Sequence, residues 1–413
     1  MRPVSAEEVE IGKPLPWSVY DRGGKLLFAQ GMMVAGEAHR AIVLERGMVV
    51  PESTSSGGQM APSMEELLGT PAGATGEGAG DRDEAEGDDD AEPAGEAQPA
   101  AEAPAEPLPP VFATLQRMRV ELERLHTAIA ECRGEDLALQ VLDMAIRLRA
   151  LVARDADAAL AAMQLEVAED DGHSARLLHA AALCQVMVQA LEWDEDESLS
   201  LLAAALTFDV ALAPMSAALN RQESALTPDQ RAIVDAHAQL GVELLQVAGV
   251  DDPVWLEAIA NHHERLDGSG YPRGLQGNEI CRGARLLAIV DIYSAMVRPR
   301  AWREAVHARH ALRSLFLERG RLVDETLATR LVREIGVFPP GTPVQLANGE
   351  VGVVWRRGSN ATHPVVARLV NANGTLAAIA TRRDTSLEGF AITGAVPPQK
   401  YQLLVAGAGR LWE

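Results

Sequence analysis

Hydrophobic residues recur at helical spacing along most of the chain after residue 110. The interval of three and four residues is clearest in the first such segment, at Leu115, Met118, Leu122, Leu125 and Ile129. A second segment, 137–152, follows a break at Gly134. Residues 111–154 are therefore predicted to be helical, as a hairpin, as the dimerisation helix of a homodimer or as an extension of the main core, and the sequence leaves these alternatives open.

Residues 155–336 continue the helical pattern and form the predicted main domain. Thr227 followed by Pro228 is typical of a helix start, because Thr caps free N–H groups and Pro fits the first helical position. Residues 285–296 form an apolar run interrupted by Asp291, and residues 325–335 predict a last helix that ends at Gly336. The pattern predicts a mainly α fold with an all-helical body.

Shorter segments predict β-structure at both ends of the chain. Residues 17–20 and 25–29 flank a glycine turn, which predicts a small β-rich module over residues 1–50. A module of this size buries little surface alone, so it either packs on the later domain or is regulatory. Residues 344–346, 351–355 and 365–370 are strand-like and are separated by Asn-Gly turns, which predicts a structural C-terminal β extension over residues 337–413.

The acidic character of the chain is concentrated in one low-complexity segment. Of the net charge of −22, residues 51–110 carry −14, from fifteen acidic residues and one Arg, and the segment is rich in Ala, Pro and Gly. It cannot bury enough apolar surface to offset the entropy of ordering, so we expect a disordered, solvated linker rather than a metal-buffering element. Since electrostatic influence fades over about 8–10 Å in salt solution, this linker does not exclude an anionic ligand elsewhere.

Composition also limits the partners and the compartment. The sequence contains no run of eighteen apolar residues, and its first residues lead into charged positions rather than an apolar signal core. The three cysteines lack the close-paired spacing of a zinc knuckle or a disulfide framework. We expect a soluble, cytoplasmic protein without a membrane partner, and the lack of a basic stripe with interleaved aromatics argues against nucleic acid.

Several histidines and carboxylates lie at positions on the predicted helices where a polar side chain needs a partner. Asp209 follows the apolar run 201–208, Asp291 interrupts another, and His237 lies inside a predicted helix. Glu169 and His173 are four residues apart, so on one helix they share a face. A buried carboxylate without a partner is costly. An ordinary structural role is the simpler interpretation for any one of these residues, but the set favours a metal site.

The most informative segment is residues 262–272, with the sequence His-His-Glu-Arg-Leu-Asp-Gly-Ser-Gly-Tyr-Pro. Adjacent histidines point about 100° apart on a helix, which a buried face seldom uses but two metal ligands could. For the His-His pair alone, a surface turn after a helix is the alternative. The whole segment resembles the signature of the HD-GYP family of cyclic di-GMP phosphodiesterases, and the resemblance continues through residues 284–291 and 300–303.

This resemblance covers roughly residues 155–336 and implies an HD-type helical bundle with a metal centre. The positions that match the family's metal ligands are Glu169, His173, Asp209, His237, His262, His263 and Asp291. A mixed shell of histidine and carboxylate suits iron or manganese at least as well as zinc, as one or two ions. The implied reaction is metal-assisted hydrolysis of the phosphodiester in cyclic di-GMP, with Asp209 as the residue on which turnover depends.

The same resemblance implies the substrate-binding residues. Gly270, Tyr271 and Pro272 would shape the pocket, and Arg300 and Arg303 would contact the ligand. Arginine suits this task because a guanidinium forks onto phosphate or a guanine edge.

The chain departs from the family at its His-Asp pair. Where the family has His-Asp followed closely by Gly and Lys, this chain has Phe208-Asp209-Val210-Ala211-Leu212, and Ser294 stands where the family usually has a second Asp. Phe208 cannot bind a metal and Leu212 cannot hold a phosphate, so a second ion is expected to be weaker or absent. Three hypotheses remain: a phosphodiesterase of reduced activity; an inactive cyclic di-GMP sensor, or a module that docks a partner such as a diguanylate cyclase; and an α-helical interaction protein without a ligand.

Overall fold

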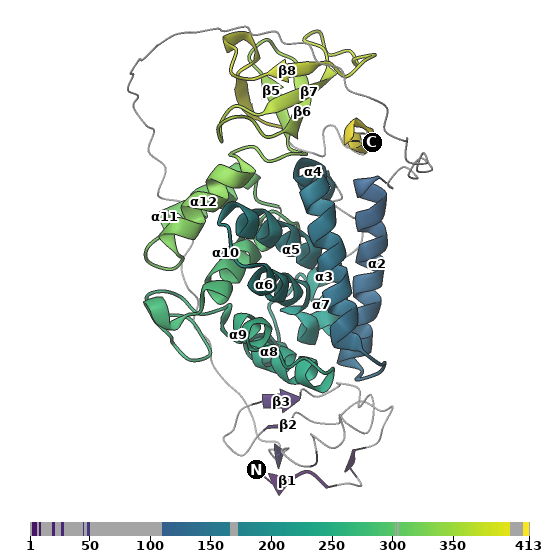
Figure 1. Ribbon diagram of the computed structural model, residues 1–413, viewed down its shortest axis with the longest axis vertical. Coiled ribbons are helices and arrows are strands. Elements are labelled where there is room, and N and C mark those ends of the chain that lie inside the picture. The colour runs from purple at the N-terminus through teal and green to yellow at the C-terminus, as the bar shows by residue number, and fades with distance from the viewer. Residues whose placement is uncertain are drawn as a thin grey trace, which may run out of the picture. The chain divides into compact units, whose positions relative to one another are not determined.

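The computed structural model describes residues 110–165, 172–301, 303, 305–396 and 408–412, together with short stretches within residues 2–49. Apart from Pro110, the predicted acidic linker lies outside the described residues. Most of the described chain is helical, as Figure 1 shows. The predicted mainly α fold is therefore confirmed.

Eleven helices lie in the described part of the chain. In chain order they are α2 (Val111–Ala130), α3 (Leu137–Arg154), α4 (Ala156–Leu165), α5 (His173–Ala190), α6 (Glu195–Thr207), α7 (Ala213–Arg221), α8 (Pro228–Val247), α9 (Pro253–Asn261), α10 (Arg282–Met296), α11 (Ala308–Leu317) and α12 (Glu325–Ile335). The predicted start of α8 is confirmed by a capping box, in which Thr227 and Gln230 exchange side-chain to backbone hydrogen bonds. Helix α12 ends, as predicted, before Gly336, which has a φ of +78°.

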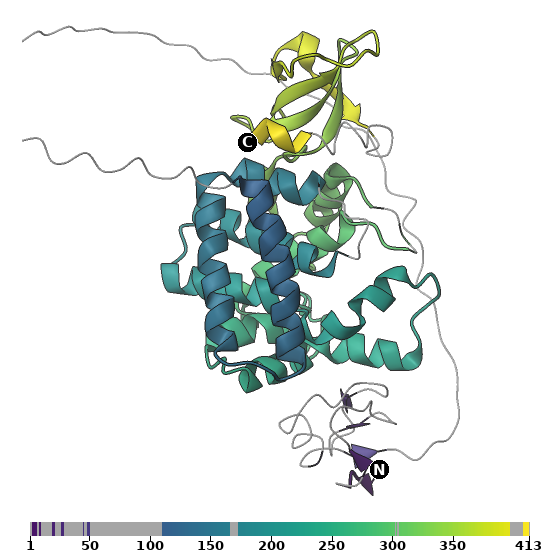
Figure 2. The ribbon, with the colours of Figure 1, turned by 90° about the vertical axis from the view of Figure 1, so that its right-hand side faces the viewer.

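Helices α2 and α3 are the first two long helices and lie side by side (Figure 2). Their buried apolar residues, such as Leu122 of α2 and Leu148 of α3, belong to the same hydrophobic cluster as α5 and α6. Of the alternatives that the sequence leaves open, the structure therefore shows two together, a helical hairpin that extends the main core, and dimerisation stays a prediction.

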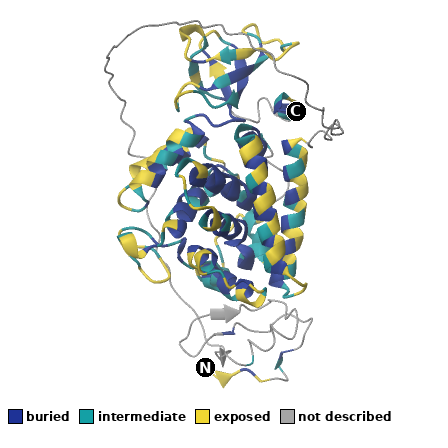
Figure 3. Ribbon diagram, in the orientation of Figure 1, coloured by how far each residue is buried: buried dark blue, intermediate teal, exposed yellow. Residues whose placement is uncertain are grey.

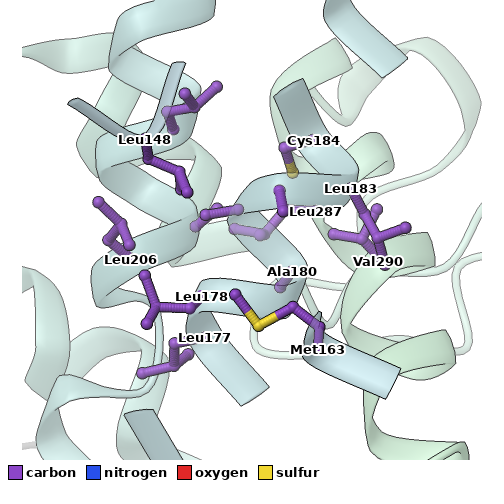
Figure 4. Close-up of a cluster of buried hydrophobic side chains, with 14 of the residues drawn as sticks. Leu148, Met163, Leu177, Leu178, Ala180, Leu183, Cys184, Leu206, Leu287 and Val290 are labelled. Atoms are coloured by element: carbon purple, nitrogen blue, oxygen red, sulfur yellow. The ribbon is translucent and has the colours of Figure 1, made fainter. Parts of the chain in front are cut away.

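The core of the helical domain is formed largely by α5, α6 and α10. Figure 3 shows these helices buried on nearly all sides, and Figure 4 shows leucines of several helices meeting, among them Leu178, Leu206 and Leu287. The stretch Glu195–Arg221 is long and apolar enough to cross a membrane by composition, with a mean hydropathy of 1.7. Its most apolar 18-residue window is 61% buried, and the short 3-10 turn Val210–Leu212 interrupts the stretch, so here it serves as a core segment.

A five-stranded antiparallel sheet follows the helices. Its strands are β5 (Pro343–Leu346), β6 (Val351–Arg356), β7 (Val365–Val370), β8 (Arg382–Asp384) and β9 (Ile392–Ala395), in the order β8-β7-β6-β5-β9. Gly349 and Gly374 occupy the two predicted Asn-Gly turns at φ of +86° and +82°. Arg356 forms an ion pair with Asp155 next to α4, so this extension contacts the helices.

Four short strands lie in the described stretches of the first 49 residues. They are β1 (Arg2–Pro3), β2 (Val19–Tyr20), β3 (Leu26–Phe28) and β4 (Met48–Val49), and they pair antiparallel in the order β1-β4-β2-β3. Strands β2 and β3 coincide with the two runs predicted around the glycine turn. The β-rich character of this module is therefore confirmed.

Candidate metal centre

Three histidines from two helices converge at one end of the helical core. His237 lies in the middle of α8, while His262 and His263 directly follow the last residue of α9. Nε2 of His237 lies 3.3 Å from Nε2 of His262 and 3.1 Å from Nε2 of His263. One ligand nitrogen from each ring lies within 4.8 Å of the others, so the cluster could hold a metal ion.

The second ring nitrogen of two of these histidines is bound to the backbone. Nδ1 of His237 lies 2.5 Å from the Val234 carbonyl oxygen, and Nδ1 of His262 lies 2.6 Å from the Ile259 carbonyl oxygen. A carbonyl oxygen only accepts hydrogen bonds, so each Nδ1 carries the proton and each Nε2 presents a lone pair. Two lone pairs that face each other at 3.3 Å are stabilised by a cation between them. The residues present therefore fit a transition-metal ion.

Burial keeps these imidazoles in the neutral form that binds metals. It lowers the pKa of His237 and places that of His262 well below its usual range. Burial, together with the neighbouring His237, lowers the pKa of His263 to about 2. At neutral pH all three rings are therefore unprotonated and ready to donate a nitrogen.

Two carboxylates lie beside the histidine cluster and share one arginine. Asp209 follows α6, and its Oδ1 lies 3.2 Å from Nε2 of His237. Asp291, inside α10, and Asp209 both form ion pairs with the guanidinium of Arg176, on the first turn of α5. Phe208 is fully buried, and its ring lies below the same guanidinium at 5.1 Å from Cζ. The carboxylate end of the centre thus already contains a cation.

The centre opens into a cavity of about 880 Å³. This volume lies in the range of small-molecule sites, which is roughly 300–1,000 Å³. The predicted residues that line it are His173, Asp209, His237, His263, Tyr271, Asp291 and Arg300. Arginines 176, 221, 231 and 298 also line it, so a cavity in a strongly acidic chain has a basic wall.

The loop after the two histidines is fixed by a buried carboxylate. Glu264 is 2% exposed, and its two oxygens accept the backbone N–H groups of Arg273 at 2.7 Å and Leu275 at 3.0 Å. Gly270 lies so close to the chain before it that an added Cβ would be 2.5 Å from Cα of Glu264. This fold places the ring of Tyr271 against His263, stacked at 4.7 Å between centroids.

One residue of the predicted site is not described by the structure, and another does not line the cavity. Helix α5 begins at His173, with Gly172 left-handed at φ +54°, and Glu169 lies outside the described residues, so the shared helix face of Glu169 and His173 stays a prediction. Arg303 does not line the cavity, because its guanidinium donates a hydrogen bond to the Ala295 carbonyl oxygen instead. Spacing alone could not predict that turn of the side chain.

One predicted ligand and two loop residues also lie away from the cavity wall. His262 is completely buried beneath the other histidines, and Gly270 and Pro272 are not among the lining residues. His173 does line the cavity, and its Nε2 is buried with no hydrogen-bond partner among the described residues. Gly270 therefore affects the conformation of the loop and does not contribute to the cavity surface.

Arg176 and Glu264 belong to the site but were absent from the predicted set. Arg176 lies near the start of α5, just before the apolar run that begins at Leu177, so the hydrophobic pattern gives no signal for it. The role of Glu264 depends on how the following loop folds, which the sequence pattern does not specify.

The fold and the site together define a helical domain in which a histidine cluster that could hold a metal ion opens into a cavity. Residues 148–327 match the HD domain family. The same helical region is similar to curated relatives named as cyclic di-GMP phosphodiesterases.

Relatives of known function share this region. The chain is 26% identical over 215 residues to a cyclic di-GMP phosphodiesterase of Pseudomonas aeruginosa, covering 51% of each chain. It is 31% identical over 166 residues to a cyclic di-GMP phosphodiesterase response regulator of Xanthomonas campestris pv. campestris, covering 40% of this chain and 44% of the relative. A 3'3'-cGAMP-specific phosphodiesterase of Vibrio cholerae is 32% identical over 123 residues, which is 30% of this chain and 28% of the relative. The chain thus spans about half, or less, of the length of these relatives.

A solved structure of a HDG"Y"P protein from Bdellovibrio bacteriovorus also matches. It has 17% sequence identity and a TM-score of 0.46, over 56% of this chain and 73% of that chain.

Proposed function

We propose that this chain is a metal-dependent phosphodiesterase that hydrolyses cyclic di-GMP, with lower activity than an HD-GYP domain with a complete His-Asp pair. The observation that carries this proposal is that the three-histidine cluster opens into a cavity walled by arginines. An anionic dinucleotide fits such a wall, and the relatives with phosphodiesterase names support the reaction class.

Different residues of the chain would hold the metal ion and bind the substrate. His237, His262, His263 and Asp209 would hold the ion, with iron or manganese suited to this mixed donor set. When bound, such an ion polarises a phosphoryl oxygen and makes its water more acidic. Arg300 binds phosphate or a guanine edge: burial, with the nearby Arg176 and Arg303, lowers its pKa to about 10, so it stays charged at neutral pH.

Two positions support the expectation of reduced activity. Phe208, in place of a histidine, offers no ligand atom, and Leu212 lines the cavity without a charge. The apolar Leu212 specifically favours a second candidate function, a cyclic di-GMP sensor that binds the ligand without cleaving it. In that case Arg300 and the Tyr271 loop would serve recognition alone.

The test is hydrolysis and binding measured side by side on the full chain. Cyclic di-GMP and 3'3'-cGAMP are incubated anaerobically with protein and Fe²⁺ or Mn²⁺, and products are separated by chromatography, while calorimetry measures binding. Turnover that is lost in His237→Ala and kept in the surface control Arg147→Ala supports the phosphodiesterase. Saturable binding without turnover supports the sensor, and neither binding nor turnover leaves a helical interaction protein.

A further inference from the structure

Arg176 connects three helices at the carboxylate end of the centre. Its side chain is only 11% exposed, and it forms ion pairs with Asp209 after α6 and Asp291 in α10. The side chains of these aspartates are 6% and 13% exposed. Two buried carboxylates need positive charge close by, because an unpaired buried charge costs several kcal/mol. The guanidinium supplies that charge from the chain itself.

The two oxygens of Asp209 face different neighbours. Oδ1 points to Nε2 of His237, at the histidine cluster, and Oδ2 points to Arg176. One carboxylate therefore joins a position where a metal ion fits to a position where a guanidinium already lies. If two ions shared the Asp209 carboxylate, the second ion would have to take the place of the Arg176 guanidinium.

The residue at position 208 matches this arrangement. The Phe208 ring lies 5.1 Å from Cζ of Arg176 and 5.2 Å, edge to face, from the His262 ring. An aromatic face attracts a cation, so it favours the guanidinium at the place where a histidine would have offered nitrogen to a metal. Both the carboxylates and the ring thus stabilise the same side chain.

We infer that Arg176 is a resident cation that takes the place of a second metal ion, so the centre binds a single ion at His237, His262, His263 and Asp209. This inference rests on the proposed metal-dependent function and specifies its metal site. Asp291 then neutralises Arg176 and is not a ligand of the bound ion. Arg176 acts as a positioning residue, because it orients Asp209 toward the histidine cluster.

The test counts bound metal rather than turnover. Mn²⁺ bound per chain is measured by mass spectrometry after gel filtration and by calorimetry, on wild type, Arg176→Met, Arg176→Lys and Asp291→Asn. We expect one tight ion in wild type and in Arg176→Lys, which keeps the charge. Arg176→Met keeps the side-chain bulk but frees the carboxylates, so the affinity for a second ion should rise by about tenfold or more.

A matched control separates this effect from the general charge of the cavity. Arg231 also lines the cavity, but its side chain is 62% exposed and pairs with Asp235 at 4.0 Å, so Arg231→Ala should still bind one ion. Asp291→Asn is nearly isosteric and should also keep one ion, which tests the inference even where Arg176→Met fails to fold.

Each outcome is decisive. Three outcomes would overturn the inference and leave the proposed phosphodiesterase standing. They are two tight ions in wild type, loss of the single ion in Asp291→Asn, and no second ion in a folded Arg176→Met. No bound ion in wild type would overturn the metal-dependent function itself. One ion in wild type, lost in His237→Ala and doubled in Arg176→Met, supports both.

Discussion

Replacing Glu264 with Gln should release the loop that carries Tyr271 while the helical core stays folded. The buried Glu264 carboxylate accepts two backbone N–H groups, from Arg273 and Leu275. Gln has the same shape, but its NH₂ group would face one of those N–H donors. Only one of the two hydrogen bonds can therefore be kept, and without the charge.

The size of the effect follows from these two bonds. A hydrogen bond to a charged group contributes about 1.5–3 kcal/mol, so the pair contributes about 3–6 kcal/mol to holding the loop. Because one weaker bond remains, we expect Glu264→Gln to lose about 2–4 kcal/mol. Because each 1.4 kcal/mol changes an equilibrium constant about tenfold, the population of the open loop should rise at least about thirtyfold.

Trypsin gives a direct assay, because Arg273 is an exposed residue of this loop. Cleavage after Arg273 should be at least about thirtyfold faster in Glu264→Gln than in wild type, and binding of cyclic di-GMP should weaken. Glu279→Gln is the matched control, since Glu279 accepts one N–H group, from Gln276, in the same loop. Equal cleavage rates in Glu264→Gln and wild type would refute the assigned role of the carboxylate.

Three further changes test the loop, the cavity and the core. Gly270→Ala places a Cβ 2.5 Å from Cα of Glu264, so it should displace the loop. The affinity for cyclic di-GMP, measured by calorimetry, should fall at least about tenfold. An unchanged affinity would contradict the observed close approach. Leu212→Lys adds a cation to the cavity wall and should tighten cyclic di-GMP binding by about tenfold, an increase that would be absent if the ligand bound elsewhere. Burial, helped by a nearby arginine, lowers the pKa of His179 to about 3, so the unfolded state takes up the proton first as pH falls below about 6.5. Between about pH 6.5 and 3, the wild-type protein therefore loses free energy of unfolding as the pH falls, by about 1.4 kcal/mol per pH unit from His179. Urea denaturation at pH 7 and 5 should show that His179→Leu loses less than wild type by this amount. Equal losses in the two proteins would exclude this linkage.

The helical body could be predicted because its signals are local. The cap at Thr227 and the stop at Gly336 act within one turn of the helix, so α8 and α12 begin or end where the sequence indicates. Asp209, His237 and Asp291 could be singled out because a polar side chain in an apolar helix needs a partner. Their convergence was implied by the resemblance, and the structure brings Asp209 to His237.

What the sequence could not specify depends on contacts between distant segments. Arg303 turns to the Ala295 carbonyl oxygen, and the two N–H groups that Glu264 accepts come from residues nine and eleven positions later. The start of α5 at His173 depends on Gly172, whose left-handed conformation the hydrophobic pattern does not specify. Arg176 could not be identified from the pattern, because its partners Asp209 and Asp291 come from segments far away in the sequence.

The replacement of a histidine by Phe208 and the position of Arg176 are best understood as one electrostatic arrangement. A histidine at 208 would place a neutral nitrogen ligand beside the carboxylates of Asp209 and Asp291, and the three groups would then suit a second dication. A phenyl ring removes that ligand, while its face stabilises the guanidinium that neutralises both carboxylates. The histidine cluster retains its own tautomers through Val234 and Ile259, which do not depend on residue 208. The carboxylate end, where Arg176 lies, can therefore lack a metal ion without disturbing the histidine cluster. For this reason an incomplete His-Asp pair remains compatible with a site that binds a single ion.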